Sequence, residues 1–431
     1  MKVLIGTVPL TGHVHPMLLV ARRLVERGHQ VVWYGASKFA AKITATGARF
    51  AGPGKAPDID DAKLDEHPAL AGKRGLRRVK AQLAELFINP MIAQYEDMEA
   101  LANEHRPDLV LADQAHLGAS LLAEKRGLRW AGLGISTLVF SSVDTAPFGA
   151  ARPPAKNDGE RKVYRFVRWI VHGLIFRSVT RAFKAQRVAA GLPAGETSYF
   201  DVLAPDLFLQ PTIPEMEYPR SDLPPQVTFV GPLVPPNAGT GELPAWWPDV
   251  EAARAAGTPI ILVTQGTMAT NPKELIAPAL KALANEDVLV VATTAATATE
   301  LGFPPPANAR LAAYVPYQAL LPHTAVMVTN GGYGGVQMAL AHAVPMVIAG
   351  GSEEKPEIAA RVAWAGVGLD LRTGRPRAKK ILRAVRRVLD ENQFKTRAAV
   401  LAAACAGHDP VTEAVSAIEA LGEVTVPKEA A

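Results

Sequence analysis

Patterns of buried strands alternate with amphipathic helical patterns along most of the chain. Near the N-terminus, an apolar run at residues 2–8 predicts a strand, residues 17–27 predict a helix, and residues 29–34 predict a second strand. The same rhythm restarts later, where a strand at 259–264 leads through a glycine turn to a helix at 272–284. Alternating strands and helices form mostly parallel sheets covered on both faces. The sequence therefore predicts an α/β protein with two Rossmann-like, doubly wound domains facing one another.

Proline and glycine are concentrated between the two repeats of this pattern, at residues 232–248. Such a composition is typical of an interdomain linker. We expect a first domain over residues 1–218, the end of its sheet and the linker over 219–258, and a second domain over 259–406. A last helical segment within 407–431 is a candidate to cross back to the first domain.

Composition narrows the class of protein. The chain has 431 residues, of which 48% are hydrophobic, so two or three domains can each bury a core. A formal net charge of +5 suits acidic ligands without indicating nucleic acid. A single cysteine, Cys405, excludes a disulfide or a cysteine zinc site within one chain. The short apolar run after Met1 and Lys2 is no signal peptide, and no stretch has the length of a membrane span, so we expect a cytoplasmic protein.

Residues 161–187 form a basic amphipathic segment in which cationic and apolar side chains alternate at near-helical spacing. Its cationic residues are Arg161, Lys162, Arg165, Arg168, Arg177, Arg181, Lys184 and Arg187. One interpretation is a pair of helices packed on the domain with a solvated basic face. The other is a helix that lies on a membrane surface and helps to reach a lipid-like substrate.

A glycine-rich turn at residues 329–335, TNGGYGG, separates the apolar run 325–328 from the helical pattern 336–342. Glycines let backbone N–H groups approach an anion closely, and the helix that follows presents the positive end of its dipole. A phosphate or diphosphate is the natural occupant of such a turn. The alternative is a tight structural connection without a ligand.

Five motifs occur in the order found in the nucleotide-sugar glycosyltransferases of family one. They are GHVHP at 12–16, LVLAD ending at Asp113, QGT at 265–267, YVPYQALL at 314–321 and TNGGYGGVQ at 329–337. The chain resembles bacterial members that glycosylate macrolides and other aglycones, over nearly its whole length. The resemblance implies the GT-B fold, with the acceptor on the first domain and a UDP- or dTDP-sugar mainly on the second. It also implies inversion at the anomeric carbon without a bound metal or other cofactor.

Two residues carry the chemistry that this resemblance implies. His13 lies in a predicted loop before the first helix, where a neutral imidazole can take the proton from an acceptor hydroxyl. Asp113, at the end of a predicted strand, matches the carboxylate that orients such a histidine. The alternatives are a capping histidine and an aspartate in a turn. His15 is a second candidate base, but a metal site built on His13 and His15 lacks a third ligand.

The resemblance places the donor contacts on the second domain. Gly332, Gly334, Gly335 and Thr267 are expected at the phosphates. Tyr314 stands where tryptophan is usual and is expected to stack on the base, with core packing as the alternative.

Three places depart from the family pattern. Asn330 replaces a histidine beside the diphosphate, which keeps a hydrogen-bond donor but cannot become cationic. Met338 replaces the glutamate that holds the ribose, so Gln337 is the candidate for that role. Glu354 and Lys355 replace an Asp-Gln pair at the sugar hydroxyls, which puts a preference for glucose in doubt. Lys355 is expected to contact the diphosphate, to pair with Glu354 or to face solvent.

Three functions fit these residues. The favoured one is an inverting glycosyltransferase acting on a hydrophobic hydroxylated molecule such as a polyphenol, a macrolide or a lipid-like acceptor. The second is a sugar-nucleotide epimerase of the same fold. The third is a non-catalytic partner protein, suggested by Asn330 and Met338. His13 and Asp113 together favour the first, because a helper protein has no need of them.

Overall fold

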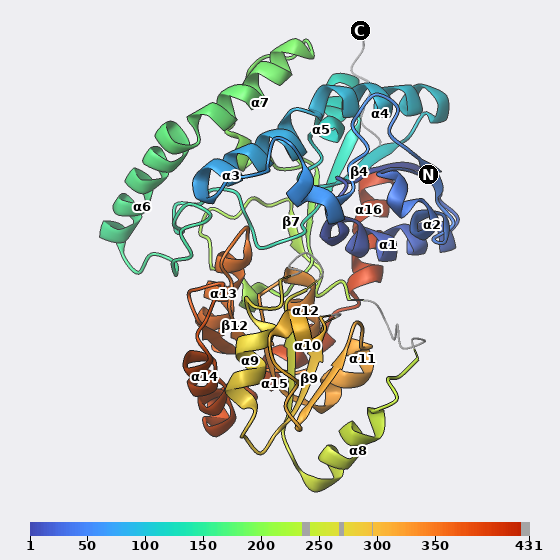
Figure 1. Cartoon of the computed structure of the whole chain (residues 1–431). Coiled ribbons are helices and arrows are strands. Elements are labelled where there is room, and N and C mark those ends of the chain that lie inside the picture. Colours follow the sequence, from blue (N-terminus) through green and yellow to red (C-terminus); the bar gives the residue numbers. More distant parts are fainter. Residues whose placement is uncertain (235–241, 267–270, 295, 424–431) are drawn as a thin grey trace.

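The computed structural model describes residues 1–234, 242–266, 271–294 and 296–423. The chain forms two α/β domains, one above the other in Figure 1, each built on its own parallel sheet. The predicted class, an α/β protein with two doubly wound domains, is confirmed. No helix in these ranges is long and apolar enough to cross a membrane.

The first domain holds a seven-stranded parallel sheet in the order β3-β2-β1-β4-β5-β6-β7. Its strands are β1 (Lys2–Gly6), β2 (Gln30–Tyr34), β3 (Arg49–Ala51), β4 (Leu109–Asp113), β5 (Arg129–Leu133), β6 (Leu207–Gln210) and β7 (Val227–Phe229). β1 is central and pairs with both β2 and β4, so the strand order reverses there. Ligands of open α/β sheets bind at such a reversal, outside the carboxyl ends of the strands.

Helices cover both faces of this sheet. The helices of this domain are α1 (Thr11–Glu26), α2 (Ala40–Thr44), α3 (Gly75–Gln82), α4 (Met91–His105), α5 (Leu117–Arg126), α6 (Asp158–Ile170) and α7 (Arg177–Ala189), with π-helical segments η3 (Leu83–Ile88) and η4 (Val171–Ile175). Successive side chains of β1 point to opposite faces, so Val3 and Ile5 join the core under α1, whereas Leu4 joins the core under α4 and α5. Both faces are buried, as a parallel sheet requires.

The second domain repeats the design with six parallel strands in the order β10-β9-β8-β11-β12-β13. Its strands are β8 (Ile260–Thr264), β9 (Leu289–Thr293), β10 (Ala309–Ala312), β11 (Thr324–Thr329), β12 (Met346–Ile348) and β13 (Gly368–Asp370). Its helices are α8 (Trp247–Ala256), α9 (Ile276–Leu283), α10 (Ala298–Leu301), α11 (Tyr317–Leu320), α12 (Tyr333–Ala341), α13 (Lys355–Trp364), α14 (Ala378–Asp390) and α15 (Asn392–Ala406). One core lies under α8, α12, α13 and α15, and the other under α9 and α14.

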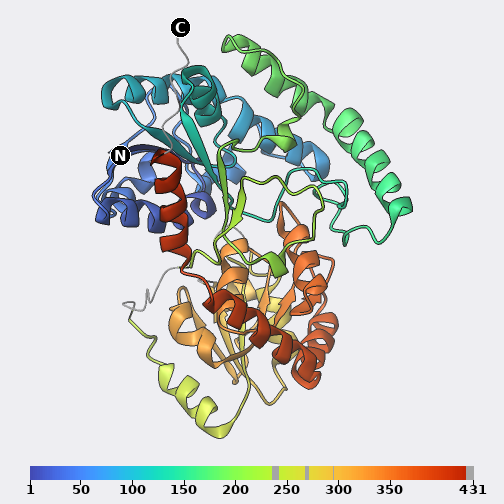
Figure 2. The same ribbon diagram turned by 180° about the vertical axis from the view of Figure 1, so that it is seen from behind.

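The last helix, α16 (Pro410–Glu423), packs on the first domain rather than on the second, which it follows in the chain. Ala414, Val415 and Ile418 join the apolar core beneath α1. At the surface, Glu419 accepts hydrogen bonds from Arg27 at 2.5 Å and from His29 at 2.7 Å. Figure 2 shows this red helix running alongside the first domain.

Two element boundaries differ from the sequence expectation. Trp247 and Val250 of α8 are buried in the core of the second domain that lies under α8, α12, α13 and α15. The packing of this domain therefore begins before the expected boundary at residue 259.

The first helix begins at Thr11 instead of at residue 17, with Pro16 inside it. The reason is a cap from a distant loop: Asp61 accepts hydrogen bonds from the Thr11 N–H at 2.6 Å and hydroxyl at 2.8 Å. A carboxylate at a helix N-terminus stabilises it. This stabilisation opposes the cost of Pro16, which is the sixth residue of the helix and cannot donate a hydrogen bond to the carbonyl of Gly12.

Candidate active site

His13 and Asp113 meet at the carboxyl edge of the first sheet. β1 ends at Gly6 and a short turn leads to α1, in whose first turn His13 lies, so this residue is helical and not in a loop as expected. Asp113 is the last residue of β4, the neighbour of β1. The two side chains are buried, and His13 Nδ1 lies 3.0 Å from Asp113 Oδ1.

The surroundings of Asp113 fix both its charge and the tautomer of His13. Its Oδ2 accepts the Val8 N–H at 2.7 Å, and its Oδ1 accepts the Ala115 N–H at 2.8 Å. Burial raises the pKa of this carboxyl, but His13, His116 and the hydrogen bond from the Val8 N–H together hold the pKa below its usual value. An ionised Asp113 only accepts hydrogen bonds, so Nδ1 of His13 carries the proton. Nε2 then presents a lone pair, as a general base requires.

Apolar side chains surround this pair. The Phe87 ring stacks on the imidazole of His13, with ring centroids 6.3 Å apart. Phe87 and Leu10 pack against a small buried cluster formed by Leu64, Leu70 and Leu86. Leu64 and Leu70 come from the long segment after β3, Leu86 and Phe87 come from η3, and Leu10 directly precedes α1.

His15 takes part in a different environment. Its Nε2 lies 3.1 Å from Nζ of Lys42, and burial together with Lys42 lowers its pKa. The imidazole of His13, and not that of His15, is therefore the one held by the strand-end carboxylate.

The glycine turn of the second domain joins β11 to α12. Gly331 has a φ of 87°, and a Cβ there would lie 2.7 Å from Cγ2 of Ile348, so glycine is required. Gly332 is the N-cap of α12, and a Cβ on Gly332 or Gly334 would meet no atom within 4 Å. The first N–H groups of an α-helix have no acceptor inside the helix. The open space at Gly332 and Gly334 therefore suits an anion, whereas a Cβ on Gly335 would contact Cε of the buried Met327 at 3.8 Å.

Asn330 is fastened to the neighbouring turn of the same domain. Its Nδ2 donates to the backbone oxygen of Gln265, while its Oδ1 is buried without a hydrogen-bond partner among the described residues. The Gln265 side chain in turn accepts the N–H groups of Leu275 and Ile276, each at 3.1 Å. Thr267, the last residue of this motif, lies outside the described residues.

The residues expected to contact the nucleoside differ in their exposure to solvent. Tyr314, after β10, is 62% exposed, which removes core packing as its explanation and leaves the ring free to stack. Gln337 is buried in α12, and its Oε1 has no hydrogen-bond partner in the part of the chain that the structure describes. Met338 is half-buried and packs against the core that lies under α8, α12, α13 and α15. The expected contacts of Tyr314 and Gln337 stay predictions.

Glu354 and Lys355 lie at the start of α13. Lys355 Nζ binds Glu353 in an ion pair, and its side chain is largely buried, so the expectation that it faces solvent is wrong. Burial lowers the pKa of Lys355, but Glu353 and Glu354 both raise it, so the lysine also interacts electrostatically with Glu354. Burial raises the pKa of Glu354, and Glu353 raises it further. Lys355 and His13 both lower the pKa of this carboxyl, but the net shift is upward. The Glu354 carboxyl therefore lies within electrostatic reach of His13 across the two domains.

Two polar contacts between the domains were missed by sequence reasoning. Tyr333, the first residue of α12, has its hydroxyl 2.9 Å from Nε2 of the buried Gln210 in β6. Arg361 in α13 donates to Glu217 of the first domain at 2.7 Å and to Glu357 of its own helix at 2.9 Å. The i,i+4 spacing of Glu357 and Arg361 is a local signal, but Glu217 is 144 residues away from Arg361 and leaves none.

Comparison with known proteins assigns the chain to a family. The family described as the C-terminal domain of erythromycin biosynthesis protein CIII-like proteins matches residues 277–421. The 4'-demethylrebeccamycin synthase of Lentzea aerocolonigenes is 42% identical over 97% of this chain and 99% of its own. UDP-glucosyltransferase 1 of Beauveria bassiana (strain ARSEF 2860) is 33% identical over 92% of this chain and 90% of its own.

Solved structures agree on the fold. The calicheamicin glycosyltransferase CalG4 superposes with a TM-score of 0.75 at 21% identity, covering 99% of both chains. The glycosyltransferase VinC in complex with dTDP gives a TM-score of 0.70 at 21% identity, covering 99% of this chain and all of its own. At this identity the likeness concerns the fold, whereas the relatives above establish the family. The chain belongs to the natural-product glycosyltransferases of family one and has their GT-B fold.

Proposed function

We propose that this enzyme transfers a sugar from a UDP- or dTDP-sugar to a hydroxyl of a hydrophobic small molecule, with inversion at the anomeric carbon. The observation that carries the proposal is the contact of 3.0 Å between His13 Nδ1 and Asp113 Oδ1, which leaves Nε2 as the basic atom. Relatives named as UDP-glucosyltransferases and a fold shared with a dTDP complex support a nucleotide-sugar donor.

His13 acts as the general base in this proposal. As the acceptor oxygen attacks the anomeric carbon, its proton passes to Nε2 of His13 and the bond from that carbon to the diphosphate oxygen breaks. The imidazole becomes cationic, and the buried carboxylate of Asp113 stabilises that charge through Nδ1. No covalent intermediate is needed, because both bonds change in one displacement.

The leaving diphosphate gains negative charge in the same step. The N-terminus of α12 offers backbone N–H groups and the positive end of a helix dipole, in a place where glycines leave room for close approach. Asn330 and Gly335 complete the proposed diphosphate contacts. Lys355 remains a candidate for this anion only if it leaves Glu353 when the donor binds.

The acceptor is proposed to be apolar because apolar side chains adjoin the base. Phe87 stacks on His13, and Leu10 continues the surface toward the cluster of Leu64, Leu70 and Leu86. An aromatic or aliphatic body packed there would place its hydroxyl at Nε2. Polyphenols, macrolides and lipid-like alcohols all satisfy this description.

The decisive variant is His13→Ala. We expect transfer to fall by roughly 10² to 10⁴, the usual contribution of a general base, while UDP or dTDP binds with unchanged affinity by calorimetry. A panel of UDP- and dTDP-sugars with a polyphenol and a macrolide, analysed by mass spectrometry, identifies the donor. Wild-type turnover by His13→Ala would refute the base. Donor epimerised without acceptor would favour an epimerase, and binding without any turnover would favour a non-catalytic partner.

A further inference from the structure

The basic segment found in the sequence folds as α6, η4 and α7, which follow one another along the outer edge of the first domain (Figures 1 and 2). Only part of it is packed on the protein. Tyr164 is buried in α6, and Val179 and Phe183 are buried in α7. The remaining side chains of α6 divide into an inner and an outer set with different roles.

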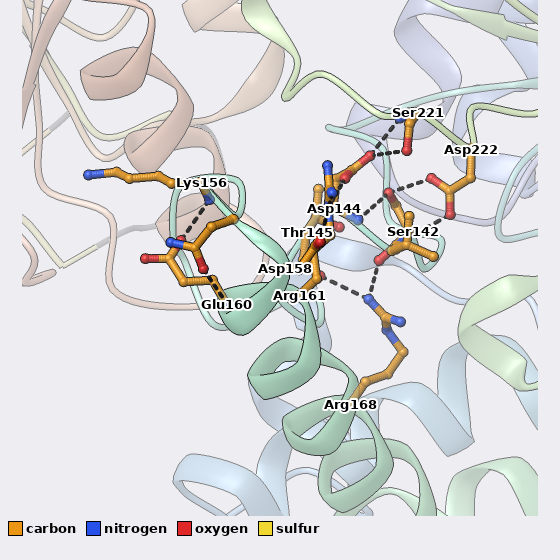
Figure 3. A network of polar contacts seen from close by, with 12 residues as sticks. Ser142, Asp144, Thr145, Lys156, Asp158, Glu160, Arg161, Arg168, Ser221 and Asp222 are labelled. Atoms are coloured by element: carbon orange, nitrogen blue, oxygen red, sulfur yellow. Dashed lines mark hydrogen bonds and ion pairs between the residues drawn. The ribbon is translucent and has the colours of Figure 1, made fainter.

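The inner cations of α6 have structural partners (Figure 3). Arg161 donates to Asp144 at 2.8 Å, and Arg168 donates to the backbone oxygens of Ser142 and Thr145. Asp144 is also held by the Ser221 hydroxyl at 2.7 Å. Arg161 and Arg168 therefore fasten the 142–157 loop and do not belong to a free basic surface.

The outer set forms a stripe of four exposed residues, Lys162, Arg165, Phe166 and Trp169, which we call the α6 stripe. Lys162, Phe166 and Trp169 follow at intervals of four and three residues, so they share one side of the helix. Phe166 and Trp169 are each 60% exposed, and their rings stack with centroids 6.1 Å apart. The stripe thus combines two cations with two large aromatic rings.

This composition does not fit a merely solvated basic face. Two adjacent aromatic rings in water are costly, and a contiguous apolar patch rimmed by charge marks an interaction site. Lysine and arginine beside tryptophan and phenylalanine match the interface of an anionic bilayer, where the rings enter the headgroup region and the cations meet phosphates. We propose that the α6 stripe docks the enzyme on the surface of an anionic phospholipid membrane.

A membrane bound to the α6 stripe would lie on the first domain, which is the domain proposed to bind the acceptor. The Tyr164 hydroxyl donates to the backbone oxygen of Pro153 at 3.0 Å, so α6 holds the 142–157 loop at a third point. The same loop reaches the second domain, because Glu357 accepts the N–H groups of Gly149 and Ala151 at 2.7 Å each. The inference itself is independent of the proposed reaction, since it rests on the surface alone.

The test is co-sedimentation of the full chain with vesicles of phosphatidylcholine, with and without phosphatidylglycerol. We expect binding only to the anionic vesicles, and less of it at high salt, where charges are screened. Phe166→Ser/Trp169→Ser and Lys162→Glu/Arg165→Glu should each weaken binding by roughly tenfold or more. Because the four side chains are exposed, both variants should keep the wild-type melting temperature.

A second basic surface supplies the matched control. Lys379 and Arg383 are exposed on α14. Lys379→Glu/Arg383→Glu changes the net charge as much as the charge variant of the stripe does, and it should leave vesicle binding nearly intact. If the control lost as much vesicle binding as Lys162→Glu/Arg165→Glu, net charge alone would explain the binding and the proposal would be overturned. No binding by the wild type, or an apolar variant that binds as well, would also overturn it. The proposal would also be overturned if light scattering showed that the wild type is a dimer and the stripe variants are not. The α6 stripe would then bind a second copy of the chain.

Discussion

Arg361 of the second domain donates from Nε to Oε2 of Glu217 in the first domain, over 2.7 Å and with both side chains at most 3% exposed. Burial opposes the charge of Arg361, but Glu217 and Glu357 raise its pKa above the usual value. The other oxygen of Glu217 accepts the Leu138 N–H at 2.9 Å. A buried cation that joins two domains in this way stabilises their relative orientation.

Replacing this cation should be costly. Arg361→Met removes the cation that the buried carboxylates of Glu217 and Glu357 share, and breaking a buried ion pair destabilises a protein by about 3–5 kcal/mol. Thermal unfolding should show a clearly lower midpoint. Arg386→Met is the control, because the ion pair between Arg386 and Glu286 lies at the surface and should change the midpoint little. Equal shifts in the two variants would contradict the role given to the interdomain pair.

His116 should make stability depend on pH. Burial lowers the pKa of this histidine to about 4, so the unfolded chain, in which the pKa is near 6.5, binds more protons between these values. Stability should therefore fall as the pH falls from 6.5 to 4, by up to about 3 kcal/mol from this residue alone. His116→Asn keeps an acceptor for the Ala119 N–H and should lose that dependence. Urea unfolding of both proteins at several pH values measures the difference, and parallel curves would refute it.

Asp113→Asn should abolish most activity without removing the imidazole. The amide can donate to Nδ1 of His13, which moves the ring proton to Nε2 and removes the basic lone pair. Transfer should fall roughly 100-fold or more. Calorimetry with UDP and dTDP should show unchanged affinity, because the proposed donor contacts lie on the other domain. A variant with wild-type turnover would mean that the carboxylate has only a structural role.

Two glycines of the diphosphate turn should respond in opposite ways. Gly334→Ala meets no neighbour and improves helix propensity, so stability should stay the same or rise by at most about 1 kcal/mol while UDP or dTDP binding weakens. Gly331→Ala forces a positive φ and a clash with Ile348, which should cost about 1–3 kcal/mol of stability. Melting curves and calorimetry separate the two effects. Unchanged affinity in Gly334→Ala would place the diphosphate elsewhere.

Tyr314 should contribute to affinity for the nucleotide and not to stability. Its exposed ring has no packing role to lose, so Tyr314→Ala should melt like the wild type. Loss of stacking on the base should weaken UDP or dTDP binding roughly fivefold or more. Tyr314→Trp restores a larger stacking surface and should bind at least as tightly as the wild type. An alanine variant with full affinity would remove the base from this position.

The architecture and the order of the motifs follow from local patterns in the sequence. Alternating apolar runs and helical patterns are local properties, so they predicted two parallel sheets, the strand before Asp113 and the glycine turn before α12. The expectation that His13 and Asp113 would meet came from the resemblance to the glycosyltransferases of family one.

Tertiary structure decided what depends on partners distant in the chain. The start of α1, and with it the helical setting of His13, is set by Asp61, which caps the helix from a loop fifty residues away. Lys355 binds Glu353, and Arg361 binds Glu217, although neither pairing follows from residue type or spacing. The division of the α6 cations into a pair that fastens the 142–157 loop and a pair in the exposed α6 stripe arises in the same way. Helical periodicity shows that a helix has two sides, but only the packed chain shows which side meets the protein and which meets water.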